Sequence, residues 1–117
     1  MQVQSISAVT LAVGDMARSV DFYRMAGFEL LYGGPDSEFT SFRAGQGYLN
    51  LTVRRDYEGR WWGRAIFYVA DVDLAHRHVV AAGLTPDTAP CDAPWGERYF
   101  HLTDPDGHEL SFAKPLH

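Results

Sequence analysis

The sequence predicts an α+β protein built from two tandem βαβββ modules. The main observation is an internal repeat: residues 9–28 and 65–84 share one order of elements at an offset of 56 positions, with Asp15 aligned to Asp71. Alternating apolar and polar residues flank each copy and indicate strands, and clusters rich in glycine, proline and aspartate separate these strands. Each copy therefore reads as a strand, a helix and three further strands.

One amphipathic helix is expected in each copy, between an aspartate and a glycine. Asp15 and Asp71 are suitable N-caps, because a side-chain oxygen can accept from the free amides of the first turn. Gly27 and Gly83 stand where a helix favours a left-handed residue at its end. Apolar residues between them recur at three-four spacing, which predicts a helix that covers a sheet. They are Met16, Val20 and Tyr23 in the first copy, and Val72, Ala75, Val79 and Ala82 in the second.

The strands that follow each helix are short. We expect them at Phe28–Tyr32, Phe39–Arg43 and Tyr48–Val53 in the first copy, and near Thr85–Thr88, at Glu97–Thr103 and at Glu109–Ala113 in the second. The segment DPDG at 104–107 has proline and glycine where a tight turn needs them, and we interpret it as a turn without any further role.

The length predicts one domain over residues 1–117. Module one is expected at about 5–53, a linker at 54–63, and module two at about 64–113. With 46% hydrophobic residues, 117 residues suffice to bury a core.

Composition also excludes several classes of function. The net charge of −5 argues against broad nucleic-acid binding, which needs a basic surface. No apolar stretch approaches the roughly 18 residues of a membrane span, and the N-terminus lacks the features of a signal peptide. The single cysteine, Cys91, fits a reducing compartment. We therefore expect a cytoplasmic protein with neither a nucleic acid nor a membrane as partner.

Alternation assigns the strand residues to two faces. One face is apolar and must be covered by the helices. The other is mixed and fits either solvent or the lining of a ligand cleft. Its residues include Ala8, Thr10, Tyr48, Asn50, Arg64, Tyr68, Tyr99, His101, Glu109 and Ser111.

The βαβββ repeat, the segment VTLAVGDMARSVDFYRMAGFEL and the segment PWGERYFHLTDPDGHELSF resemble the vicinal oxygen chelate superfamily. This group contains glyoxalases, extradiol dioxygenases and bleomycin-resistance proteins. The resemblance covers roughly residues 5–113. It implies an open, curved mixed sheet with the helices on its convex face and a ligand cleft on its concave, mixed face.

In enzymes of this superfamily four positions on the concave face can hold a divalent metal. By resemblance these positions fall on Ala8, Asn50, Arg64 and Ser111. None is a good ligand, because Ala8 has no donor atom, Arg64 is a cation, and the other two offer only neutral oxygens. The resemblance therefore favours a metal-free small-molecule binding protein without a cofactor, similar to the bleomycin-resistance branch. The alternative is a lyase, isomerase or dioxygenase that uses a divalent metal in an atypical site.

The resemblance implies a ligand-binding set on the mixed face and beside it: Asn50, Trp61, Trp62, Arg64, Tyr68, Trp95, Tyr99, His101, Glu109 and Ser111. His101 and Glu109 are the candidates for catalysis, since a Glu–His pair can transfer protons, although it can equally be a stabilising cross-strand pair. Arg64 can bind an anionic group of a ligand or pair internally with Glu109.

The tryptophans of the linker suggest the type of ligand. Trp61 and Trp62 can form a stacking wall for a flat aromatic compound, contribute to a subunit contact, or cap the core. By resemblance to the bleomycin-resistance proteins, which confer antibiotic resistance, the ligand is an aromatic or cationic compound that the protein sequesters. The same resemblance implies a homodimer.

Overall fold

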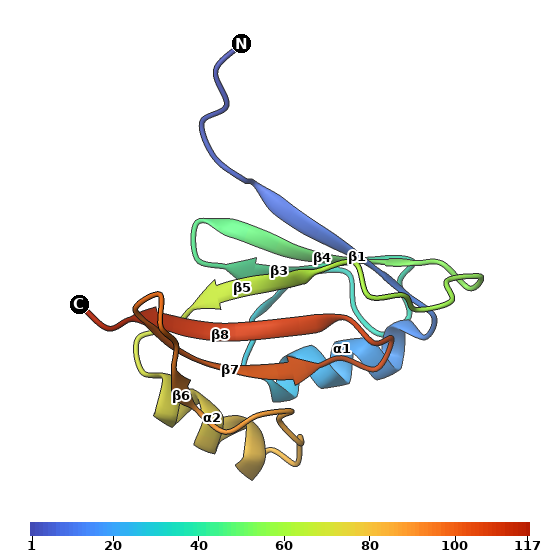
Figure 1. Ribbon diagram of the computed structural model, residues 1–117. Helices are drawn as coiled ribbons and strands as arrows, with labels where there is room; N and C mark the ends of the chain where they lie inside the picture. The colour runs from blue at the N-terminus through green and yellow to red at the C-terminus, as the bar shows by residue number, and fades with distance from the viewer.

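The computed structural model describes residues 1–117 and confirms the predicted α+β architecture with two βαβββ modules (Figure 1). Module one contains β1 (Ala8–Val13), α1 (Met16–Met25), β2 (Leu30–Tyr32), β3 (Phe39–Ala44) and β4 (Gly47–Val53). Module two contains β5 (Arg64–Tyr68), α2 (Val72–Ala81), β6 (Cys91–Asp92), β7 (Glu97–Thr103) and β8 (Glu109–Pro115). Neither helix is long and apolar enough to cross a membrane.

Each module forms a mixed four-stranded sheet. The strand orders are β1-β4-β3-β2 and β5-β8-β7-β6, and in each sheet the first pair is parallel while the others are antiparallel. The edge strands β1 and β5 line a common groove, but no backbone ladder joins them. The arrangement is therefore two open sheets that lie next to each other rather than one continuous sheet.

Both helices begin and end as the sequence predicts. Asp15 accepts a hydrogen bond from the amide of Arg18 at 3.1 Å, and Asp71 accepts one from the amide of Leu74 at 3.0 Å. The glycine after each helix has a positive φ, 101° in the first module and 100° in the second, which a residue with a side chain rarely adopts.

The prediction of a strand near Thr85–Thr88 is wrong, because the corresponding strand β6 lies later in the chain. Pro86 lacks an amide hydrogen and cannot contribute one to a ladder. The segment is instead attached to β7 by a backbone bond from Asp87 to the carbonyl of His101, and by side-chain bonds of Asp87 and Thr88. Such side-chain bonds compete with regular strand pairing.

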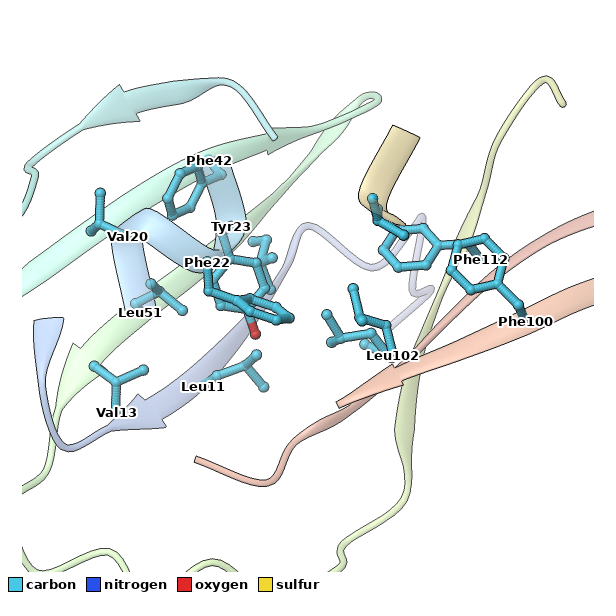
Figure 2. Packing of buried hydrophobic residues seen from close by; sticks show 14 of the residues in the cluster. Leu11, Val13, Val20, Phe22, Tyr23, Phe42, Leu51, Phe100, Leu102 and Phe112 are labelled. Carbon is cyan, nitrogen blue, oxygen red and sulfur yellow. The ribbon is translucent and has the colours of Figure 1, made fainter. Parts of the chain in front are cut away.

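The apolar faces of both sheets and the helices form a common core (Figure 2). Its largest fully buried side chains include Tyr23 and Phe42 from module one and Phe100 from module two. Phe28 joins the two halves: its ring centroid lies 5.7 Å from that of Tyr23 and 5.1 Å from that of Phe67. The apolar face predicted by alternation is thus the face that the helices cover.

The turn at 104–108 also connects the two modules, which corrects the expectation that it has no further role. Asp104 is 4% exposed and accepts a hydrogen bond of 2.6 Å from the buried hydroxyl of Tyr23 in α1. Asp106 accepts a bond from the amide of Gly14 at 3.0 Å and one from Ser19 at 3.3 Å. Two carboxylates of module two therefore hold the junction between β1 and α1 of module one.

His108 extends this junction to the linker. The indole nitrogen of Trp62 donates to its Nδ1 at 2.8 Å, so Nε2 carries the hydrogen and donates to the carbonyl of Ala12 at 2.7 Å. Tyr57 stacks on the imidazole with ring centroids 5.1 Å apart. His108 is 2% exposed, and these contacts make it a structural residue that fixes the linker against both modules.

Candidate functional site

Most of the predicted site residues gather on one surface, the polar face of module two. This face is the side of β5, β7 and β8 that points away from the helices. It carries a cavity of about 160 Å³. The cavity is lined by Arg64, Ile66, Trp95, Glu97, Tyr99, His101, Ser111 and Ala113. Ser111 and Ala113 are buried and contribute small side chains to the lining, which leaves room for a ligand.

Arg64 is paired with Glu109 at the edge of this cavity. Its Nε donates to Oε1 of Glu109 at 3.2 Å, and Nη2 lies 3.2 Å from the same oxygen. The second carboxylate oxygen accepts a bond of 2.6 Å from the indole nitrogen of Trp61, whose ring lies 5.8 Å from the guanidinium carbon. Of the two alternatives for Arg64, the structure has the internal ion pair.

The pKa of the Glu109 carboxyl reflects these partners. Desolvation is the largest influence and raises the pKa, but the hydrogen bond from Trp61 and the charge of Arg64, with smaller contributions, outweigh it. The pKa therefore lies below its ordinary value, and Glu109 remains a carboxylate at neutral pH.

His101 lies diagonally across from Glu109. In the β7–β8 ladder His101 is paired with Ser111, while Glu109 is paired with Thr103, and Nε2 of His101 is 3.7 Å from Oε1 of Glu109. Burial is the main cause that lowers the pKa of His101, and Arg64 lowers it further, while Glu109 raises it. The imidazole is neutral at neutral pH. Its Nδ1 is buried without a hydrogen-bond partner.

Glu97 is a member of the site that the sequence analysis missed. It accepts hydrogen bonds from the hydroxyl of Tyr68 and, at 2.9 Å, from the indole nitrogen of Trp95. The bond to Glu97 is the main cause that raises the pKa of Tyr68, so the phenol stays protonated. The signal was available, because Glu97 has the same parity along β7 as Tyr99 and His101 and must share their face.

Two predicted residues lie elsewhere. Asn50 is paired with Thr10 in the β1–β4 ladder and donates weakly to its hydroxyl at 3.4 Å, while its own side-chain oxygen is buried without a partner. Trp62 lines a different cavity, of about 710 Å³, between β1 and the linker. The adjacent residues His108 and Glu109 hold Trp62 and Trp61 respectively, which separates the two indoles.

The donor set does not fit a divalent metal. Among the four positions that the resemblance indicates, Arg64 lines both the groove between the modules and the small cavity, Ala8 lines only the groove, Ser111 lines only the cavity, and Asn50 lines neither. No group of three or more His, Cys, Asp or Glu side chains is placed to bind a metal ion together. Arg64 places a cation where a metal would lie. The negative charge of its partner Glu109 is already compensated by this ion pair.

Comparison with known proteins places this geometry in a family. An uncharacterized protein of Mycobacterium tuberculosis is 28% identical over 122 residues, which covers 91% of this chain and 72% of that protein. The crystal structure of TioX from Micromonospora sp. ML1 is 29% identical, with a TM-score of 0.77 over 97% of this chain and 100% of that one.

A bleomycin-binding protein in complex with bleomycin has the same fold. It is 20% identical, with a TM-score of 0.78 over 96% of this chain and 98% of that one. In sequence, residues 5–112 match the family described as the Glyoxalase/Bleomycin resistance protein/Dioxygenase superfamily. The match covers most of the chain and both βαβββ modules, and the protein therefore belongs to this superfamily.

Proposed function

We propose that the protein binds a small organic molecule, aromatic or cationic, on the polar face of module two, without a metal, and sequesters it. The Arg64–Glu109 ion pair carries this proposal. It occupies a position where the resemblance expects a metal ligand, and both charges are already satisfied within the protein.

The surroundings of the ion pair support binding rather than chemistry. Trp61, Trp95 and Tyr99 offer aromatic surface beside the cavity, and the polar groups among them are few and fixed, as is common in ligand pockets. The nearest acid–base candidates, His101 and Glu109, are 3.7 Å apart, and Glu109 is engaged by Arg64 and Trp61. Bleomycin is the first ligand to test, since the similar bleomycin-binding protein holds it.

A homodimer accompanies this proposal. Large apolar side chains are exposed on and next to the polar face of module two, among them Ile66 of β5 at 57%, Trp61 of the linker at 68% and Trp95, just before β7, at 70%. Exposed apolar patches of this kind mark binding surfaces. A second copy that borders this face would deepen the cavity from its open side. Sedimentation equilibrium is expected to give twice the chain mass of 13.1 kDa, and a monomer at all concentrations would contradict the dimer.

The binding proposal predicts saturable quenching of tryptophan fluorescence by bleomycin in the presence of EDTA. Trp95→Phe and Trp61→Phe should each reduce the quenching amplitude, because Trp95 lines the cavity and Trp61 contacts Arg64, which also lines it, while the matched variant Trp62→Phe should keep it. Purified protein is expected to contain no stoichiometric metal after dialysis, measured by mass spectrometry. Tightly bound Zn, Ni, Mn or Fe at one ion per chain would favour the metal-dependent enzyme instead.

A further inference from the structure

The carboxylate of Glu97 has no cationic partner. Its two hydrogen-bond donors, Tyr68 and Trp95, are neutral, and no Arg, Lys or His nitrogen lies within 4.0 Å of it. Glu109, on the same face, is paired with Arg64. Glu97 therefore leaves one uncompensated negative charge at the cavity, since the other two charges cancel and His101 is neutral.

Aromatic rings surround this charge. Trp95 stacks on Tyr99 with ring centroids 5.9 Å apart and an interplanar angle of 23°. Tyr68 contacts Glu97 through its hydroxyl, and its side chain is 65% exposed. The faces of such rings carry partial negative charge and attract cations, most strongly for tryptophan. The rings and the carboxylate therefore favour the same kind of ligand.

The chemistry of the cluster also selects among cations. A primary ammonium is strongly hydrated and needs acceptors for its three hydrogens. Here each oxygen of Glu97 already accepts one bond, from Tyr68 or from Trp95, so its two remaining lone pairs cannot serve all three ammonium hydrogens, and the rings offer only their faces. An ammonium whose hydrogens are replaced by methyl groups needs no acceptors, and its methyl groups pack on aromatic surface and on Ile66, which also lines the cavity.

We propose that Glu97, Trp95, Tyr68 and Tyr99 form a subsite for the alkylated ammonium group of a small-molecule ligand. This inference rests on the proposed function, whose ligand class it narrows. The cavity of about 160 Å³, which Trp95, Glu97 and Tyr99 line, suits a compact head group, and the rest of the ligand would extend toward His101 and the Arg64–Glu109 pair.

The test compares choline with 3,3-dimethylbutan-1-ol, its uncharged isostere, in nuclear magnetic resonance titrations of ¹⁵N-labelled protein. Choline is expected to shift the indole N–H signal of Trp95 saturably, with a dissociation constant in the millimolar range, because each exposed cation–π contact is weak. The isostere should bind at least about tenfold more weakly. Equal shifts with both compounds would show that charge is not recognised and would overturn the proposal.

Two variants distinguish a specific effect of the Glu97 carboxylate on choline binding from the attraction of choline to a negatively charged protein. Glu97→Gln retains acceptor geometry for one of the two donors but removes the charge, and should weaken choline at least about tenfold. Glu58→Gln removes the charge of an exposed carboxylate of the linker and should leave the affinity unchanged. Equal losses in both variants would indicate nonspecific attraction and would contradict the subsite.

Two further titrations, with bleomycin and with lipid vesicles, distinguish a failure of the subsite from a failure of the proposed function. Bleomycin that binds while choline does not would overturn the subsite and leave the proposed function intact, whereas the failure of both would contradict both. Phosphatidylcholine vesicles present the same head group on a surface. Binding to them at head-group concentrations where free choline has no effect would contradict a small-molecule ligand.

Discussion

Replacing Asp104 with alanine is expected to lower the free energy of unfolding by about 3 kcal/mol, because buried donors lose their acceptor. Asp104 accepts from the hydroxyl of Tyr23 at 2.6 Å and from the amides of Asp106 and His108, both at 2.9 Å. Tyr23 has no exposed surface, so water cannot replace the lost acceptor. The turn that positions His108 and the linker would loosen at the same time.

Asp104→Asn separates the hydrogen bonds from the charge. The amide has nearly the same shape and keeps an acceptor for the two backbone amides but not for the hydroxyl of Tyr23, so we expect a loss of about 1–2 kcal/mol, smaller than that of Asp104→Ala. Urea unfolding measures both variants, with Asp56→Ala as an exposed control. Similar losses for Asp104→Ala and Asp56→Ala would contradict the role of the turn as the junction between modules.

The buried carboxyl of Asp104 also predicts that the free energy of unfolding depends on pH. Burial is the largest influence on the pKa of Asp104 and raises it above the ordinary 3.8, although the hydrogen bonds from Tyr23 and the backbone lower it. The folded protein then holds the proton more tightly than the unfolded chain, so this contribution is fully present below the ordinary pKa and is lost as the pH rises through the folded pKa. As the pH rises above about 4, wild type should lose stability relative to Asp104→Asn. The opposite trend would contradict the burial of a charged Asp104.

Replacing Phe112 with alanine is expected to cost about 4 kcal/mol of unfolding free energy, because the change leaves a cavity in the core. Phe112 is 5% exposed, and its ring centroid lies 5.3 Å from that of Phe100 and 5.7 Å from that of Phe67. Phe112 also lies between Ser111 and Ala113 in β8, both of which line the ligand cavity. Ligand binding should therefore weaken together with stability.

Two controls accompany this variant. Phe112→Leu fills most of the space and should cost about 1–1.5 kcal/mol. Phe39→Ala removes a ring that is 40% exposed on β3 and should cost less than Phe112→Ala by at least about 2 kcal/mol. Equal costs for Phe112→Ala and Phe39→Ala in urea unfolding would contradict the placement of Phe112 in the core.

The two faces of the sheets could be predicted from the sequence because the side-chain period of a strand is two. This rule assigns Phe100 and Leu102 to the core, and Tyr99 and His101 to the polar face, and burial confirms the core assignment. The same rule places Glu97 on the polar face with Tyr99 and His101.

Contacts between distant segments could not be predicted in this way. The bond between Tyr23 and Asp104 spans 81 positions, and nothing local in the DPDG segment shows that its carboxylates point into the other module. The separation of Trp61 and Trp62 has a related cause. Their acceptors, Glu109 and His108, are neighbours at the start of β8, and successive side chains there point to opposite sides.

Ligand binding on the polar face of module two, without a metal, is tested most directly by titrating bleomycin into ¹⁵N-labelled protein in EDTA. The indole signals of Trp61 and Trp95 should shift saturably, together with the amides of β5, β7 and β8, while the indole signal of Trp62 remains in place. Shifts confined to Trp62 and the amides of Val9–Ala12 would place the ligand in the larger cavity under the linker and would contradict this site. Saturable shifts that appear only after a divalent metal is added would contradict binding without a metal.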